Sequence, residues 1–356
     1  MTPLILLGAG KIGETIAQFL QGSGDYALTV ADKDPVRLAP FAELGVKTAR
    51  ADFGDAHALA SLIRGHAMVI SACPFYLTPS IAHAAVTAGA HYFDLTEDVE
   101  STRRVKALAA DARTALMPQC GLAPGFISVL AYAMTRKFQS LRDVQMRVGA
   151  LPVYPTNALK YNLTWSTDGL INEYCNPCEA IIDGSMRETL ALEEIEAFSL
   201  DGVTYEAFNT SGGLGTLCET LSGRVENLNY KTVRYPGHRD LVKMLIRDLR
   251  LGQRREILKD VLEASVPMTH QDVVLVFVTV SGMQDGRLTQ ESFAKKIYSK
   301  TLTERLYSAI QITTAAGVCA MTDLMREGAL PQRGFVRQED ADLELFLANR
   351  FGRHYA

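Results

Sequence analysis

The sequence has 356 residues, 47% of them hydrophobic and 21% charged, with 36 Lys and Arg against 40 Asp and Glu. Such a chain can bury a sizeable core, which excludes a mainly disordered protein, and its length favours two domains. The net charge of −4 provides no basic excess for nucleic acid or an anionic lipid surface, and no stretch reaches the roughly 20 apolar residues of a membrane helix.

Short apolar runs alternate with helical segments over the first 118 residues. Strands are predicted at residues 4–7, 27–31, 46–49, 68–72, 91–95 and 115–118. Helices are predicted at residues 11–21, from 34 onward, and at 56–63, 78–88 and 98–112. Strands separated by helices of this length are typical of βαβ units, so residues 1–122 are predicted to form an α/β domain with a Rossmann-type, doubly wound parallel sheet.

The pattern changes after Pro124-Gly125, where alternating apolar and polar residues indicate half-exposed strands. Strands are predicted at residues 144–148, 179–183, 189–192, 203–208 and 273–280, and helices at 126–138, 238–249 and 253–264. Residues 123–310 are therefore predicted to form an α+β domain for substrate binding and dimerisation. A long helix is predicted at 303–326, and the segment 311–356 is expected to return to the first domain.

A glycine-rich segment, Gly8-Ala9-Gly10-Lys11-Ile12-Gly13, joins the first predicted strand to the first predicted helix. In this motif the first glycine allows a tight turn, the second lets the backbone approach a pyrophosphate, and the third lets helix and strand pack closely. Asp32 lies 19 residues after Gly13, where a carboxylate accepts hydrogen bonds from ribose hydroxyls. These features predict NAD as the cofactor, although the adjacent Lys33, a further candidate contact, weakens the preference over NADP. A glycine-rich turn without a ligand is the alternative.

Further candidate cofactor contacts follow the later strands, because the carboxyl ends of parallel strands line the ligand crevice. They are Asp52, Ser71, Ala72, Cys73, Pro74, Cys120, Gly121, Ala123 and Pro124. Asp52 is equally compatible with a solvated turn, and the segment 121–125 with a plain turn between domains.

An acidic segment follows the fifth predicted strand. Asp94, Thr96 and Glu97 are predicted to face the crevice as substrate-binding or catalytic groups. The alternative is that the acids cap the next helix, for which Asp98 is well placed.

Cations and aromatic residues gather near residue 235. Lys231, Arg234, Tyr235 and His238 lie within eight residues, and Arg224 precedes them. Guanidinium and ammonium groups hold carboxylates, so this cluster predicts a carboxylate-bearing substrate. His238 is a candidate for proton transfer near neutral pH, or for capping the helix that follows.

Six cysteines are scattered along the chain, and Cys175-Asn176-Pro177-Cys178 stands alone. This spacing indicates no disulfide framework, and a zinc site would need a second pair of ligands, so no metal is predicted. The N-terminus lacks the basic start and cleavage site of a signal peptide, and a cytoplasmic protein is expected.

Over nearly its whole length the sequence resembles the saccharopine dehydrogenase-like family. The residues that support this are the glycine motif, Asp32 and the segments 71–75, 94–98 and 121–126. Within the family, the segments 164–170, 209–215 and 231–238 are most similar to lysine 6-dehydrogenases. One departure is Ala123, because fungal saccharopine reductases usually carry an acid there and prefer NADPH.

The resemblance implies NAD-dependent oxidative deamination of the ε-amino group of L-lysine, giving NADH, ammonia and allysine, which cyclises to 1-piperideine-6-carboxylate. The ε-ammonium has a pKa of about 10.4 and must lose a proton before its carbon can release a hydride. Glu97 is expected to receive this proton, with His238 or Lys231 as a relay. Arg224 or Arg234 is expected to hold the α-carboxylate. The resemblance also implies a homodimer or a higher homo-oligomer.

Two other functions remain open from the sequence. A saccharopine or carboxyspermidine-type reductase would use NAD(P)H to form a C–N bond and would need a second carboxylate pocket. An NAD-binding regulatory protein would keep the fold without turnover, and tight NADH binding with no amine oxidation would reveal it.

Overall fold

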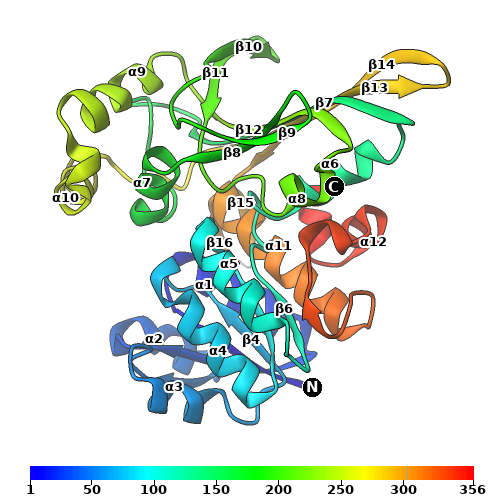
Figure 1. The fold of residues 1–356 in the computed structure, drawn as a ribbon. Helices are drawn as coiled ribbons and strands as arrows, with labels where there is room; N and C mark the ends of the chain where they lie inside the picture. The colour runs from blue at the N-terminus through cyan, green and yellow to red at the C-terminus, as the bar shows by residue number, and fades with distance from the viewer. Residues whose placement is uncertain (303) are drawn as a thin grey trace. The chain divides into compact units, whose positions relative to one another are not determined.

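The computed structural model describes residues 1–302 and 304–356, which divide into two compact units (Figure 1). The first unit contains Met1–Phe126 and Gln311–Ala356, and the second contains Ile127–Ile310. None of the described helices combines the length and the apolar character that a membrane crossing requires.

The first unit is built on a seven-stranded parallel sheet in the order β17-β6-β5-β4-β1-β2-β3. Its strands are β1 (Thr2–Leu7), β2 (Tyr26–Asp32), β3 (Lys47–Arg50), β4 (Met68–Ser71), β5 (His91–Asp94), β6 (Ala115–Met117) and β17 (Gly334–Phe335). Its first five helices are α1 (Lys11–Ser23), α2 (Pro35–Glu43), α3 (Ala56–Ile63), α4 (Thr78–Ala88) and α5 (Val99–Ala109). The strand order reverses between β1 and β4, which is where doubly wound sheets bind ligands. The predicted Rossmann-type fold class is confirmed.

Local sequence explains why these elements form. Leu4, Ile5, Leu6 and Leu7 of β1 are all 0% exposed, as expected of a strand covered on both faces. Helices α2, α3 and α5 begin after aspartates whose carboxylates accept backbone N–H hydrogen bonds; these are Asp34, Asp55 and Asp98. Such caps satisfy donors that a helix leaves unpaired in its first turn.

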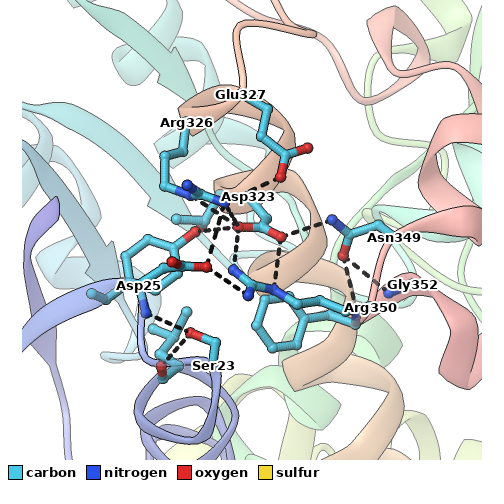
Figure 2. A network of polar contacts seen from close by, with 12 residues as sticks. Ser23, Asp25, Asp323, Arg326, Glu327, Asn349, Arg350 and Gly352 are labelled. Carbon is cyan, nitrogen blue, oxygen red and sulfur yellow. Dashed lines mark hydrogen bonds and ion pairs between the residues drawn. The ribbon is translucent and has the colours of Figure 1, made fainter. Parts of the chain in front are cut away.

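The C-terminal segment belongs to the first unit, where it adds β17 beside β6 and contributes α11 (Ala309–Arg326) and α12 (Leu343–Ala348). Asp323 of α11 is the centre of a polar network that ties this segment to β2 (Figure 2). Its carboxylate accepts hydrogen bonds from the Tyr26 hydroxyl at 2.8 Å, Asn349 Nδ2 at 2.9 Å and Arg350 Nη2 at 2.8 Å. Arg326 Nη2 donates to it at 3.0 Å.

The second unit is built on a mixed sheet in the order β10-β11-β12-β7-β13-β14, with β8 paired to β12 and β9 paired to β8. Its strands are β7 (Ser140–Pro152), β8 (Cys178–Ile182), β9 (Ser185–Thr189), β10 (Glu196–Leu200), β11 (Val203–Asn209), β12 (Val225–Arg234), β13 (Asp272–Gln284) and β14 (Arg287–Tyr298). Its helices include α7 (Thr167–Cys175), α8 (Leu217–Leu221), α9 (His238–Lys243) and α10 (Arg255–Ser265). Helix α6 spans Phe126–Thr135. The predicted α+β character of this region is confirmed.

Several predicted elements differ from the structure. The helix predicted at 238–249 is α9 followed by a π-helical turn at Met244–Asp248. The strand predicted at 189–192 ends at Thr189 as β9. The helix predicted from Thr303 begins at Ala309, because Arg305–Tyr307 pairs as β16 with β15 (Lys300–Leu302). Thr303 itself lies outside the described residues.

Candidate active site

The three glycines of the motif have different surroundings. Gly8 has a φ of 102° and a Cβ there would lie 2.7 Å from the Ala72 carbonyl oxygen, while a Cβ on Gly13 would lie 2.0 Å from the Gly8 oxygen. The nearest atom to a Cβ on Gly10 would be Arg37 Nη1, at 4.0 Å. The outer glycines are therefore required for packing, whereas Gly10 leaves open space in which a pyrophosphate can approach the backbone.

Helix α1 presents its N-terminus to this space. Gly10 is the N-cap, no side chain caps the helix, and Lys11 and Ile12 begin its first turn. An uncapped helix N-terminus offers backbone N–H donors and partial positive charge, which suit phosphate groups.

Asp32 is held at the end of β2 with 6% of its surface exposed. Its Oδ2 accepts the Ala9 N–H at 2.8 Å and its Oδ1 accepts the Asp34 N–H at 2.9 Å. These bonds fix the carboxylate against the glycine loop, and each oxygen retains a lone pair for a ribose hydroxyl. The neighbouring Lys33 is exposed.

Asp52 has the contacts of a turn residue. It is exposed, and its Oδ1 accepts the Gly54 N–H at 3.0 Å. This local bond is the solvated-turn alternative that the sequence left open. The contacts of Asp52 do not include the glycine loop, so we leave it out of the cofactor site.

At the end of β4, some residues pack against the glycine loop and one buried hydroxyl has no hydrogen-bond partner among the described residues. The Ala72 carbonyl packs against Gly8, and Cys73 Sγ donates to the Leu7 carbonyl at 3.3 Å. Burial raises the pKa of Cys73 to about 12, so it is a thiol at neutral pH. Pro74 precedes the short helix Phe75–Leu77. Ser71 Oγ is buried and has no hydrogen-bond partner among the described residues, which marks a position where a ligand can bind.

Asp94 supports the backbone instead of facing a crevice. It is 1% exposed, its Oδ2 accepts the Tyr92 hydroxyl at 2.8 Å, and its Oδ1 accepts the N–H groups of Thr96 at 3.0 Å and Gln119 at 2.8 Å. Burial raises its pKa to about 6. These contacts contradict the predicted substrate contact, because the carboxylate is buried and both of its oxygens accept hydrogen bonds within the protein.

The residues after Asp94 divide between capping and the candidate site. Thr96 is also buried, and its Oγ1 accepts the Asp98 N–H at 3.1 Å, so it is structural as well. Asp98 caps α5 by accepting the Ser101 N–H at 2.7 Å. Glu97, between them, is half-buried, and its role as a proton acceptor stays a prediction.

The loop after β6 is packed through its backbone. The Cys120 N–H donates to the Asp94 carbonyl at 2.9 Å, and its buried Sγ donates to the Met117 carbonyl at 3.0 Å. A Cβ on Gly317 of α11 would lie 2.6 Å from the Gly121 oxygen. This contact holds the loop that continues through Ala123 and Pro124, and a loop so fixed can present backbone groups to a flat ligand.

In the second unit, strand β12 directs its polar side chains to two faces. Successive residues of a strand alternate, so Tyr230, Thr232 and Arg234 share one face and Lys231 lies on the other. Lys231 Nζ donates to the Glu194 carbonyl at 2.7 Å and lies 3.6 Å from Glu196 Oε2. The predicted proton relay through Lys231 is therefore replaced by a structural ion pair on the opposite face from Arg234.

Arg234 is a buried guanidinium. It is 2% exposed, its Nε donates to the Tyr174 hydroxyl at 2.9 Å, and its Nη1 donates to the Val233 carbonyl at 2.8 Å. Its Cζ lies 4.9 Å from the centre of the Tyr161 ring. No carboxylate of the described residues forms an ion pair with it, although Glu173 is near enough to raise its pKa. A buried charge without a paired counter-ion is costly, which favours a role in binding an anion.

His238 fixes the orientation of Tyr174. Its Nε2 accepts the Tyr174 hydroxyl at 3.0 Å, and its Nδ1 donates to the Leu159 carbonyl at 2.8 Å. Burial and the charge of Arg234 lower its pKa to about 3. A neutral imidazole with both nitrogens engaged cannot serve as the predicted relay near neutral pH, so its role is to hold Tyr174 against Arg234.

Arg224 and Tyr235 do not join this group. Arg224 is exposed in the turn before β12, and ten residues of strand place it about 33 Å from Arg234. Tyr235 donates its hydroxyl to the Pro152 carbonyl at 2.9 Å and stacks on Tyr205. One small substrate cannot contact both arginines, so Arg234, and not Arg224, is the candidate for binding a substrate carboxylate.

The residues that the sequence analysis missed surround Arg234 or are buried and unsatisfied. Tyr161 and Tyr174 contact the guanidinium, and Glu173 of α7 affects the pKa of both tyrosines. Asn162 Oδ1 and Thr164 Oγ1 are buried without partners among the described residues. Thr164 lies in segment 164–170, which carries part of the family resemblance, and nothing in the spacing of the others indicates a site.

The described residues contain no cluster of three or more His, Cys, Asp or Glu side chains fit to hold a metal ion.

Comparisons with known proteins establish the family. Residues 121–350 match the model described as saccharopine dehydrogenase C-terminal domain, and residues 4–117 match the saccharopine dehydrogenase NADP binding domain. The chain belongs to the saccharopine dehydrogenase family. It is therefore an oxidoreductase with a nicotinamide dinucleotide as its cofactor, and the family resemblance seen in the sequence is confirmed.

The curated relatives are much longer proteins. The chain is 21% identical over 191 residues to the mitochondrial alpha-aminoadipic semialdehyde synthase of Rattus norvegicus, covering 51% of this chain and 21% of that protein. It is 20% identical over 314 residues to the Bos taurus protein of the same name, covering 84% of this chain and 33% of that protein. The chain thus spans between a fifth and a third of these relatives.

Solved structures show the same fold. The apo saccharopine dehydrogenase (L-Glu forming) from Saccharomyces cerevisiae has a TM-score of 0.81 at 18% identity, covering 99% of this chain and 98% of that chain. The homospermidine synthase of Legionella pneumophila, in complex with NAD, has a TM-score of 0.68 at 14% identity, covering 99% of this chain and 89% of that chain.

Proposed function

We propose that this protein is an NAD-dependent amino acid dehydrogenase that oxidatively deaminates the ε-amino group of L-lysine to allysine. The observation that carries the proposal is Arg234, a buried guanidinium without an ion pair among the described residues and stacked on Tyr161. Glu173 acts on this guanidinium from beyond ion-pair distance, and a carboxylate of the substrate would be its directly bound counter-ion. The sequence resemblance to lysine 6-dehydrogenases supports lysine as the substrate.

The residues of the first unit suit the cofactor. The open space at Gly10, the uncapped N-terminus of α1 and the fixed carboxylate of Asp32 would hold the pyrophosphate and the adenosine ribose. The nicotinamide, when bound, accepts the hydride from the carbon that bears the amine.

Loss of the hydride leaves an imine, and water must add to its carbon to release ammonia and give the aldehyde of allysine. The other step is proton transfer. The ε-ammonium of lysine, with a pKa of about 10.4, carries its proton at neutral pH, so a base must accept it. We assign this task to Glu97, which is half-buried beside the Asp98 cap. Tyr174, oriented by the neutral His238, keeps Arg234 in place for the α-carboxylate.

A panel of substrates tests the proposal. NADH formation is measured with L-lysine, D-lysine, ornithine and saccharopine, each with NAD and with NADP. We expect L-lysine with NAD to give the highest kcat/KM. Turnover of saccharopine but not of lysine would support the alternative of a saccharopine-type reductase, and the similar yeast structure is named a saccharopine dehydrogenase. NADH binding without turnover of any amine would support a regulatory protein.

Cofactor preference depends on the charge of Asp32. Asp32→Asn keeps an oxygen for the Ala9 N–H but removes the charge that repels the 2′-phosphate of NADP. We expect the ratio of kcat/KM for NAD to that for NADP to fall by about 10- to 100-fold, equivalent to roughly 1.4–2.7 kcal/mol. Asp52→Asn, at the exposed turn after β3, is the matched control and should leave the ratio unchanged. An equal ratio in Asp32→Asn and the wild type would remove Asp32 from the ribose site.

A further inference from the structure

Gln119 is a buried glutamine in an unusual backbone conformation at the carboxyl end of the first unit's sheet. It follows Pro118 after β6, has a φ of 64° and is 2% exposed. Its side-chain Oε1 is buried without a hydrogen-bond partner among the described residues. A positive φ at a non-glycine residue strains the backbone, and a buried acceptor without a partner loses its hydrogen bonds to water. Both destabilise the fold, and their combination is typical of a functional position.

The backbone of Gln119 is fixed by its neighbours. Its N–H donates to Asp94 Oδ1 at 2.8 Å, and Asp94 is itself held by the Tyr92 hydroxyl at 2.8 Å. The next residue, Cys120, donates its N–H to the Asp94 carbonyl at 2.9 Å. The carboxamide of Gln119 therefore starts from a rigid point, as a group that orients a ligand must.

The strand order indicates which part of a dinucleotide lies nearest to Gln119. The proposed pyrophosphate site is at β1 and α1, and Asp32, which accepts the Ala9 N–H, would place the adenosine ribose at β2. The other half of the molecule must extend the opposite way, past Ser71 at the end of β4. Strand β6 lies two strand spacings, about 10 Å, beyond β4. Gln119 thus lies on the nicotinamide side of the sheet.

We propose that Gln119 Oε1 accepts a hydrogen bond from the carboxamide NH2 of the nicotinamide and so fixes the orientation of the ring. The nicotinamide half of the cofactor carries ribose hydroxyls and this amide as its donors, and the amide is the donor on the ring itself. The inference rests on dinucleotide binding by the family and not on lysine as the substrate, so it does not depend on turnover.

The test compares ligands with and without the nicotinamide by calorimetry. In Gln119→Met the side chain keeps its length and loses its acceptor. We expect its dissociation constant for NADH to rise about 10-fold, the effect of one lost hydrogen bond. Its dissociation constant for ADP-ribose, which has no nicotinamide, should equal that of the wild type, and this binding also shows that the variant is folded.

A chemical substitution in the cofactor completes the test. The reduced 3-acetylpyridine analogue has a methyl group in place of the amide NH2. The wild type should bind it about 10-fold more weakly than NADH, and Gln119→Met should bind both alike. Gln338→Met is the matched control, since this buried glutamine donates to the Pro118 carbonyl at 2.9 Å, and it should leave the ratio of NADH to ADP-ribose affinity unchanged.

Three results would overturn the proposal. They are an unchanged NADH affinity in Gln119→Met, an equal loss of affinity for NADH and ADP-ribose, and no NADH binding by the wild type.

Discussion

Replacing Arg234 by methionine is expected to lower kcat/KM for L-lysine by about 100-fold or more, without changing the affinity for NADH. The guanidinium is 2% exposed and is stacked 4.9 Å from the Tyr161 ring centre, so a carboxylate bound to it is shielded from water. Removing one partner of such a buried, hydrogen-bonded charge pair costs about 2–5 kcal/mol. Steady-state kinetics and NADH titration measure the two effects.

Two comparisons distinguish carboxylate binding from damage to the fold. Arg224→Met removes the same side chain from the exposed turn before the same strand, and its kcat/KM should be close to that of the wild type. The diamine 1,5-diaminopentane lacks the carboxylate of lysine. The wild type should strongly prefer lysine over this diamine, while Arg234→Met should treat both alike. If Arg234→Met still prefers lysine, Arg234 does not bind the carboxylate.

The structure of the candidate nucleotide site could be predicted because its signals are local. The glycine motif occupies six consecutive residues, and the requirement for Gly8 and Gly13 arises from backbone that is close in the fold. The apolar run 4–7 predicted a strand covered on both faces, and all four residues are fully buried. The tight turn, the close packing of helix and strand, and the burial of the strand each depend on residues that are adjacent in the sequence, so a short segment predicts them.

The surroundings of Arg234 in the candidate substrate site could be predicted only in part. Near its end, strand β12 shows no alternation of buried and exposed residues, because residues 230–234 are all buried. No strand was therefore predicted there, and the sequence did not show that Lys231 and Arg234 lie on opposite faces. Tyr174 lies 60 residues from Arg234, and its contacts depend on how α7 packs. A sequence shows that an arginine is present but not whether it is buried, and burial is what separates Arg234 from Arg224.

The same argument applies to supporting residues. The acids at 94–98 were expected to face a crevice, yet Asp94 binds the N–H of Gln119, which is 25 residues away. Tyr26 and Asp323, which bond at 2.8 Å, are 297 residues apart. Contacts over such separations follow from tertiary packing, which no periodicity in the chain encodes.

Replacing Asp323 by alanine is expected to lower the free energy needed to open the C-terminal segment by about 3 kcal/mol, the cost of breaking a buried charge network. The Asp323 side chain is 1% exposed, and its loss leaves the hydroxyl of Tyr26 and two guanidinium groups without their shared acceptor (Figure 2). The remaining acid of the network, Asp25, is 43% exposed and 2.6 Å from Arg350. Water can replace Asp25, but it cannot easily replace Asp323.

Hydrogen exchange of the α12 amides measures this opening locally. Tryptophan fluorescence would not report on it, because the single tryptophan, Trp165, lies in the second unit. A loss of 3 kcal/mol corresponds to roughly 150-fold faster exchange. Asp25→Ala is the control and should cost less than about 1 kcal/mol, because exposed ion pairs are weak. Equal protection in the two variants would contradict a central role for Asp323.

Acid should reproduce the effect of the Asp323 substitution in the wild type. Burial alone would raise the pKa of Asp323, but hydrogen bonds from Arg350, Asn349 and Tyr26 bring it below its usual value. An acid with a lowered folded-state pKa stabilises the fold above its unfolded-state pKa of about 3.9, and the stabilisation is lost as the pH falls further. Protection of α12 in the wild type should therefore decline below about pH 4 and approach that of Asp323→Ala, whose own protection should depend less on pH there. A parallel decline in both proteins would show that other acids control the opening of this segment.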